Sequence, residues 1–195
     1  IGARIEVVAG ALRQRQYVRN GTGFLSGGDP RVHFGLGAST QAAVVITWPS
    51  GQRQQLDGVL ANQIVEVVEP SFVMTAPIAV GGTTTLDLDI QGDAGLLYGM
   101  VLAFADAPHS PLPGGLFLPL QLDALSNYSL IPGNPFFSNP LSVLDASGHA
   151  STMLTMPNQP ALSGLTLYAT AATLQPQGFP QFRTVFPKAV RIDVQ

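Results

Sequence analysis

The sequence predicts an all-β fold, with a small β domain followed by an antiparallel β-sandwich. Short runs of alternating apolar and polar residues recur along the 195 residues, separated by turn residues at intervals of roughly ten positions. The chain has 21 glycines and 16 prolines, the residues that tight turns favour. Prolines and asparagines also interrupt residues 127–140 at spacings that no helix would accept.

The chain begins with a predicted hairpin. Ile5 and Val7 alternate with polar neighbours, Ala9-Gly10-Ala11 favours a tight turn, and residues 12–18 return as a second strand. The long polar side chains of residues 13–17 indicate that this second strand faces solvent on at least one side.

A third strand is expected from Arg31, after the turn Gly27-Gly28-Asp29-Pro30. Val32, Phe34 and Leu36 would point to one face of it, and His33 to the other. Three more strands follow in this reading, over residues 42–48, 52–56 and 64–68, and a Trp48-Pro49-Ser50-Gly51 turn joins the first two.

These first residues resemble the ASPIC/UnbV domain. The resemblance covers residues 1–70 and is carried by Ile1-Gly2-Ala3-Arg4-Ile5, residues 21–25 and 29–37, Trp48-Pro49-Ser50-Gly51 and Asn62-Gln63. It implies a domain that follows a β-propeller of FG-GAP or VCBS-type repeats in exported proteins. We therefore expect the chain to be the C-terminal part of such a protein, with the propeller upstream. The calcium sites of such repeats are not carried over, because the matching residues are absent.

A linker is expected over residues 71–77, where the composition changes. Residues 1–70 hold six arginines and five acidic residues, whereas residues 71–195 hold three basic residues and seven aspartates. The second part is rich in Leu, Ala, Pro and Gly. The boundary therefore predicts an ASPIC/UnbV-like domain over 1–70 and a sandwich domain over 78–195.

The second domain shows strand patterns of the sandwich type. They lie at residues 83–90, 96–105, 116–122, 150–156, 164–174 and 189–194. Such a series is typical of an immunoglobulin-like or a jelly-roll-like sandwich. Residues 157–162 and 164–171 also resemble a β-sandwich domain that recurs in large exported bacterial proteins, which favours an extracellular or cell-surface location.

Composition excludes several classes of partner. Only 11% of the residues are charged, Lys188 is the single lysine, and the formal net charge is -3, so we expect no nucleic acid and no anionic membrane surface as a partner. No run of 18 apolar residues is present, so no membrane span is predicted. The absence of cysteine excludes disulfides and thiolate metal sites.

Three residues of the first domain are candidate ligand-binding residues. His33 faces away from the apolar side of its predicted strand, although a lone histidine is more often a hydrogen-bonded structural residue. Trp48 and Tyr17 could form a platform on which a sugar ring stacks. A tryptophan in so apolar a strand is, however, more often part of the core.

The acidic residues of the second domain suggest a calcium site. No other cofactor is expected. Asp87 and Asp89 share one face of a strand, and Asp93 follows closely, so three carboxylates could hold Ca²⁺ at an edge loop. The spacing is not that of an EF-hand. Solvated aspartates on an outer sheet face are the alternative interpretation.

The sequence predicts no enzyme. Asp145, Ser147 and His149 are the residue types of a hydrolase, but no Gly-x-Ser-x-Gly motif is present, and neighbouring residues of a strand point to opposite faces. No phosphate-binding loop is found either, because Gly21-Thr22-Gly23 opens no helix.

We therefore expect a structural and interaction module that acts in adhesion or extracellular assembly. Phe136, Phe137 and Phe179 lie among loop-like prolines and would present an apolar surface to a protein partner or a second copy. The alternative is a carbohydrate-binding module, assisted by Ca²⁺ at Asp87 and Asp89.

Overall fold

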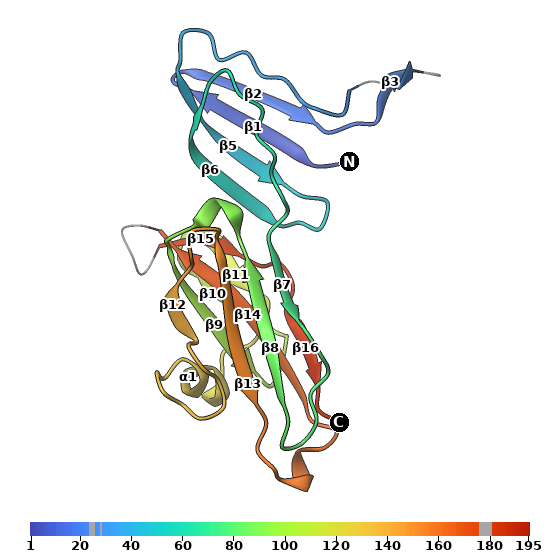
Figure 1. Ribbon diagram of the computed structural model, residues 1–195, viewed down its shortest axis with the longest axis vertical. Coiled ribbons are helices and arrows are strands. Elements are labelled where there is room, and N and C mark those ends of the chain that lie inside the picture. The colour runs from blue at the N-terminus through green and yellow to red at the C-terminus, as the bar shows by residue number, and fades with distance from the viewer. Residues whose placement is uncertain (24–25, 28, 176–180) are drawn as a thin grey trace. The chain divides into compact units, whose positions relative to one another are not determined.

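The computed structural model describes residues 1–23, 26–27, 29–175 and 181–195. Within these residues the chain divides into two compact units, Ile1–Glu69 (unit 1) and Pro70–Gln195 (unit 2), each built on antiparallel sheets (Figure 1). One α-helix, α1 (Ala124–Ser129), occurs in the described part of the chain. The prediction of an all-β fold is confirmed.

Unit 1 is organised around one four-stranded antiparallel sheet in the order β2-β1-β5-β6. Its strands are β1 (Arg4–Ala9), β2 (Leu12–Tyr17), β5 (Gln41–Thr47) and β6 (Arg53–Leu60). Two short strands, β3 (Gly21–Gly23) and β4 (Ser26–Gly27), pair separately. The predicted hairpin is present, and its turn uses Gly10 at a φ of 59°, which glycine adopts without a steric penalty.

Residues 31–36 do not form the strand that we expected. They run extended over one face of the sheet, where Phe34 and Leu36 pack against the small core of Val7, Ala9 and Ala42. The Nε2 atoms of Gln14 and Gln16 donate to the carbonyls of Gly35 and His33, both at 2.6 Å. These side chains of β2 satisfy carbonyls that would otherwise accept hydrogen bonds from a neighbouring strand. Residues 31–36 can therefore stay extended without main-chain pairing to the sheet.

Two further expectations near the unit boundary are wrong. Residues 64–68 form no strand, and Ile64 is 78% exposed, because β6 ends at Leu60 and the chain turns at Asn62 with a φ of 60°. Residues 71–77 do not link the two units, because they lie within unit 2, where β7 (Ser71–Met74) pairs with the next strand. Phe72 anchors β7 in the core, 5.9 Å from the ring of Phe186.

Unit 2 is a sandwich of two antiparallel sheets. One has the order β13-β8-β7; the other has the order β12-β9-β14-β15, with β16 also paired to β14. Besides β7, the sandwich consists of β8 (Thr83–Asp89), β9 (Leu97–Ala103), β12 (Leu141–Val143), β13 (His149–Thr155), β14 (Thr166–Leu174), β15 (Phe182–Val185) and β16 (Val190–Asp193).

The strand order is that of an immunoglobulin-like sandwich. The first, second and fifth sandwich strands (β7, β8 and β13) form one sheet, and the third, fourth, sixth, seventh and eighth form the other. The two sheets meet at one side through a parallel bridge between Ile78 and Val194. Of the two sandwich types that the sequence left open, the connectivity matches the immunoglobulin-like one.

The main core of unit 2 lies between the two sheets. It is formed by fully buried side chains from both, including Leu86, Leu88, Met100, Leu102, Leu154 and Ile192. Alternation along β8 and β13 sends every second residue inward, as the sequence pattern predicts.

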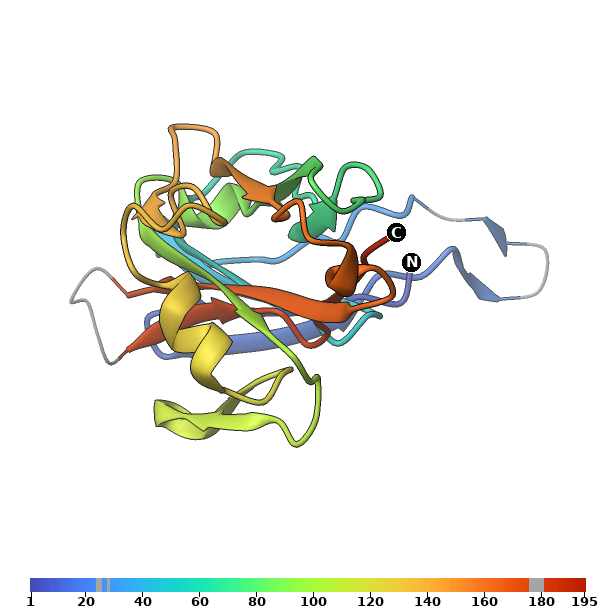
Figure 2. The same ribbon diagram turned by 90° about the horizontal axis from the view of Figure 1, so that it is seen from below.

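A long connection between β9 and β12 covers part of the other face of the β9-β14 sheet. It holds β10 (Ser110–Leu112), the 3₁₀ turn Pro113–Gly115, β11 (Leu116–Leu118) and α1. Leu118 and Leu120 pack there against Val101, Ala103 and Ala172. Figure 2 shows α1 and the β10-β11 ribbon on this outer side of the sandwich.

Candidate interaction surfaces

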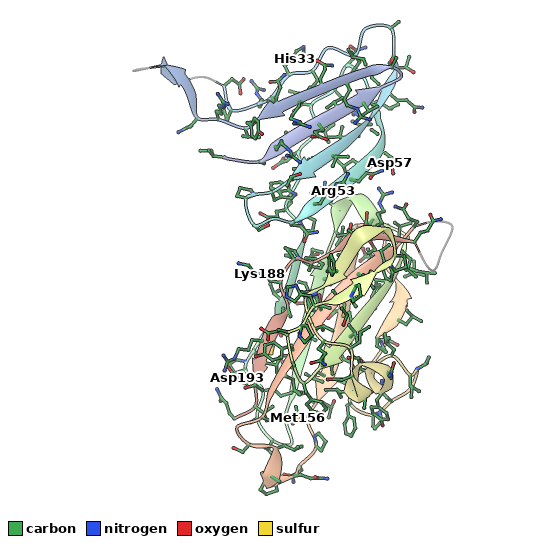
Figure 3. All side chains as sticks on the ribbon, turned by 180° about the vertical axis from the view of Figure 1, so that it is seen from behind. His33, Arg53, Asp57, Met156, Lys188 and Asp193 are labelled. Carbon is green, nitrogen blue, oxygen red and sulfur yellow. The ribbon has the colours of Figure 1, made fainter. Side chains whose placement is uncertain are left out.

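The structure does not bring His33, Trp48 and Tyr17 together. His33 is exposed on the segment that covers the core and, since Phe34 points inward, it faces away from the sheet (Figure 3). Trp48 is half-buried, and its Nε1 donates to Gln54 Oε1 at 3.0 Å. Tyr17 lies on the opposite sheet face from Gln16 and is 48% exposed. The stacking platform of two aromatic rings is therefore not formed.

Tyr17 nevertheless lines a shallow hollow in unit 1. The Arg19 guanidinium lies 5.8 Å from the centre of the Tyr17 ring. Both residues line a hollow of about 350 Å³ together with Ile1, Gly2, Val18, Asn20 and Gly21. A hollow of this volume is large enough for a small ligand. Of the two predicted aromatic residues, Trp48 and Tyr17, Tyr17 is the one that lines it.

The predicted grouping of Asp87, Asp89 and Asp93 is wrong. Asp87 accepts a hydrogen bond from Ser151 Oγ at 2.7 Å, and Asp89 lies 2.9 Å from His149 Nδ1 on the outer face of the β8-β13 pair. Asp93 is fully buried, because the 3₁₀ turn Gln91–Asp93 carries it inward after β8. Within the described ranges, no three His, Asp or Glu side chains lie together as a metal site would require.

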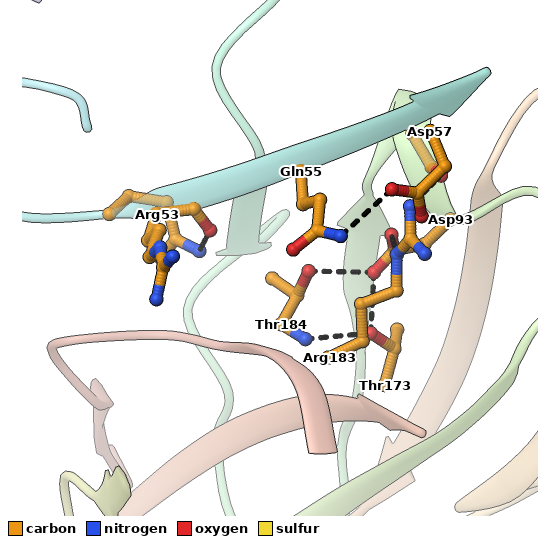
Figure 4. A network of polar contacts seen from close by, with 9 residues as sticks. Arg53, Gln55, Asp57, Asp93, Thr173, Arg183 and Thr184 are labelled. Atoms are coloured by element: carbon orange, nitrogen blue, oxygen red, sulfur yellow. Dashed lines mark hydrogen bonds and ion pairs between the residues drawn. The ribbon is translucent and has the colours of Figure 1, made fainter. Parts of the chain in front are cut away.

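Asp93 instead lies at the centre of a buried polar network (Figure 4). Arg183 Nε donates to Oδ1 at 2.6 Å, and the hydroxyls of Thr173 and Thr184 donate to Oδ2 at 2.5 and 2.7 Å. The Thr184 N–H donates in turn to Thr173 Oγ1 at 3.1 Å. Both carboxylate oxygens are therefore satisfied, and the network ties the turn after β8 to β14 and β15.

The residues of the hydrolase alternative close a turn. Asp145 Oδ1 accepts from Ser147 Oγ at 2.6 Å and from the Ser147 and His149 N–H groups at 2.8 and 2.9 Å. These bonds, that from the Ser147 hydroxyl above all, lower the pKa of Asp145 to about 2. The Ser147 hydroxyl thus contacts a carboxylate and not the imidazole that would activate it.

The His149 imidazole pairs with a different carboxylate. Its Nδ1 lies 2.9 Å from Asp89 Oδ1, and this hydrogen bond raises the pKa of His149, with further contributions from the nearby carboxylates of Asp89, Asp87 and Asp145. The arrangement stabilises the protonated imidazole on the sheet surface.

The predicted apolar surface of Phe136, Phe137 and Phe179 is only partly present. Phe137 is fully buried in the core of unit 2 and bridges to Leu154, so this part of the prediction is wrong. Asn134 Oδ1 accepts from the N–H of Phe137 at 2.7 Å, so the main chain of the buried residue is also satisfied. Phe136 is half-buried, with its ring centre 5.8 Å from that of Tyr128. Phe179 lies outside the described residues.

A different apolar surface is exposed on unit 2, and we call it the β12 strip: Leu97, Leu141 and Val143. These side chains are 44%, 50% and 52% exposed. Val143 lies opposite Leu97 and Leu141 opposite Gly99, so the three share one sheet face. The alternation Leu-Ser-Val after Pro140 signals a strand, but only three residues carry it, too few for the sequence pattern to stand out.

The fold and these surfaces define an all-β chain of two modules, a small sheet domain and an immunoglobulin-like sandwich. Residues 1–72 match the model of the family described as ASPIC and UnbV, so the resemblance predicted for the first domain is confirmed. This family is one of extracellular-type modules. The match ends within β7, and the chain has no match among the curated proteins. Among the described residues, no helix has the length and hydropathy to cross a membrane.

Proposed function

We propose that the chain is a non-catalytic structural and interaction module of an exported or cell-surface protein, and that it acts in adhesion or extracellular assembly. The observation that carries this proposal is the β12 strip, an apolar surface on the edge strand β12 of the sandwich and on its neighbour β9. The proposed partner at this surface is a second copy of the chain.

The main-chain groups of β12 support pairing with another strand. The Leu144 N–H donates to the Leu96 carbonyl, and the Met100 N–H donates to the Pro140 carbonyl. Since hydrogen-bonded positions alternate along an antiparallel pair, Ser142 is bonded to β9, while the N–H and C=O of Leu141 and Val143 face the open edge.

A second copy fits this edge because the strand is self-complementary. Two β12 strands paired about a two-fold axis at Ser142 would place Leu141 of one copy opposite Val143 of the other. No charge lies within β12, whereas the edge strand β16 carries Arg191 and Asp193 and β2 carries two arginines. Charges on edge strands prevent self-pairing, and β12 lacks this protection.

Sedimentation velocity of the full chain, over concentrations from about 1 µM to 1 mM, tests the proposal. The mass should rise from that of a 20.5 kDa monomer towards twice that value. Val143→Lys should hold the chain monomeric. Val73→Lys is the matched control, because Val73 is a valine of similar exposure (48%) on the other sheet and should leave association unchanged. A wild-type chain that stays monomeric throughout would refute self-association. Equal effects of both variants would show that the β12 strip is not the contact surface.

The carbohydrate-binding alternative rests on the hollow beside Tyr17. A glycan array with wild-type protein and with Tyr17→Ala tests it, and repeating the array with a chelator tests the proposed help of Ca²⁺. Binding that disappears with Tyr17→Ala would favour this function. An array without any signal would reject it.

A further inference from the structure

The outer face of β2 in unit 1 carries a row of arginines that the proposed function does not use. Arg13, Arg15 and Tyr17 alternate along the strand and therefore share one face, and Arg19 joins them by contacting the Tyr17 ring. We call these four residues the arginine ladder. All four are exposed, and the Arg15 side chain is 58% exposed.

The opposite face of β2 holds the ladder in place. Gln14 and Gln16 point to the core side and donate to the carbonyls of Gly35 and His33. These two bonds fix the strand against the covering segment, so the arginines are presented outward from a backbone that is already ordered. A ligand at the ladder would therefore not have to order this strand.

The ladder has more positive than negative charge. Glu6 is opposite Arg15 in the neighbouring strand, with 2.7 Å between the charged groups, and it also lies 3.7 Å from Arg4 Nε. Arg13 has no ion pair or side-chain hydrogen bond within the described ranges. One carboxylate thus faces several guanidinium groups, and an anionic partner would complement the surface.

The main chain of β2 is also available at its outer edge. Among the described residues, β2 is an edge strand of the four-stranded sheet, with β1 as its one neighbour. The Val18 N–H donates to the Ala3 carbonyl of the neighbouring chain segment. Since hydrogen-bonded positions alternate along an antiparallel pair, the main-chain groups of Gln16 and Gln14 are also hydrogen-bonded to β1. The N–H and C=O groups of Arg13, Arg15 and Tyr17 therefore face outward, beside their own side chains.

We propose that β2 binds an extended acidic peptide segment of a partner protein as an added antiparallel strand. Residues two apart in any strand repeat every 6.6–6.8 Å, about the same distance in both chains, so acidic side chains at alternate positions would meet Arg13 and Arg15 in turn. Residues directly opposite lie about 4.5–5.5 Å apart, within reach of paired guanidinium–carboxylate hydrogen bonds. This surface is on a different unit from the β12 strip, so the inference goes beyond the proposed self-association.

Two other interpretations of the ladder make different predictions. Arginines on an edge strand also prevent self-pairing, and in that case no ligand would bind. A sulfated or uronate polysaccharide would match the charge, but it has no main-chain groups to pair with those of Arg13, Arg15 and Tyr17. The unused edge is therefore the observation that favours a peptide.

Fluorescence anisotropy with a labelled peptide tests the inference, with the full chain in the Val143→Lys background to keep β12 pairing out of the measurement. The probe alternates Thr and Glu over eight residues. A second peptide has the same composition with its glutamates in one block, and a third has the alternating sequence with N-methyl groups on the backbone nitrogens that would pair with β2.

We expect the alternating peptide to bind most tightly and to weaken as NaCl is raised. The N-methylated peptide keeps the charge but cannot pair, so it should lose the binding. Arg13→Gln with Arg15→Gln should weaken binding about fivefold or more. The matched control, Arg31→Gln with Arg191→Gln, removes the same charge from exposed arginines that already have acidic partners and should change binding little.

Several outcomes would overturn the inference. Equal binding of all three peptides would show a charge effect without strand addition, and absence of binding would leave the ladder as a protected edge. Binding of heparin with no binding of the alternating peptide would assign the surface to polysaccharides. The N-methylated peptide is used with unaltered β2, so this test does not depend on the folding of the arginine variants.

Discussion

The burial of Phe137 can be tested directly, because the sequence alone suggested that this side chain is exposed. Its side chain is fully buried among the core residues of unit 2. Phe137→Ala removes an aromatic ring from a packed site, so the free energy of unfolding should fall by about 3–5 kcal/mol. Urea denaturation followed by far-UV circular dichroism measures this. With a slope of about 2 kcal/mol per molar urea, the midpoint for unit 2 should fall by about 1.5–2.5 M.

Phe136 is the matched control, since it is the same residue type one position earlier. It is half-buried and contacts the Tyr128 ring, a pair that contributes about 0.5–1.5 kcal/mol. Phe136→Ala should therefore destabilise the chain much less than Phe137→Ala. If both variants change the free energy of unfolding by less than about 1 kcal/mol, the assignment of Phe137 to the core is wrong.

Three further predictions concern polar and turn residues of unit 2. Arg183→Met should lower the free energy of unfolding by about 3–5 kcal/mol, because the buried Asp93 carboxylate would lose its charged partner. If urea denaturation gives the same free energy of unfolding for the variant and the wild type, the network does not stabilise the fold as proposed. Gly148→Ala should strongly lower the melting temperature, since Gly148 has a φ of 84° and an added Cβ would lie 2.2 Å from the Ile90 carbonyl oxygen; an unchanged melting temperature would contradict this placement. Asp145 should titrate at about 2 by NMR. Because this pKa is lowered on folding, the carboxylate stabilises the fold above its unfolded pKa, and this contribution should be lost as pH falls from about 4 to about 2. Asp145→Asn should reduce the dependence of stability on pH but not abolish it, because the pKa of Asp193 is also lowered in unit 2.

The proposed function and the further inference place different interactions on the two units. The β12 strip of unit 2 is apolar and uncharged, which suits a second copy, whereas the β2 face of unit 1 is basic and suits an acidic partner. High salt should weaken binding at the arginine ladder and leave association through the β12 strip largely unchanged. Ionic strength therefore distinguishes the two surfaces in one set of experiments.

Local pattern was sufficient for many elements of the fold. The alternating residues of β8 and β13 define their buried faces, and the tight turn at Gly10 joins β1 to β2, as expected. These predictions depend only on the period of the side chains and on the backbone freedom of glycine, which are properties of neighbouring residues. The short strand β12 was not predicted from the sequence, because three residues are too few to show an alternating pattern.

The candidate sites were harder to predict, because a site depends on contacts between distant parts of the chain. Asp93 follows Asp87 and Asp89 closely in sequence, yet it is buried against Arg183 and two threonines that lie 80 to 91 residues further along the chain. Residues 31–36 have the pattern of a strand, but two glutamines of β2 bind their carbonyls from the side. By itself the sequence determined the all-β class, through the period of its side chains, and the similarity of residues 1–72 to the ASPIC and UnbV family, through local motifs. Only the tertiary structure decided which polar groups are buried and which edges stay open, because hydrogen-bond partners and sheet neighbours come from segments far apart in the chain.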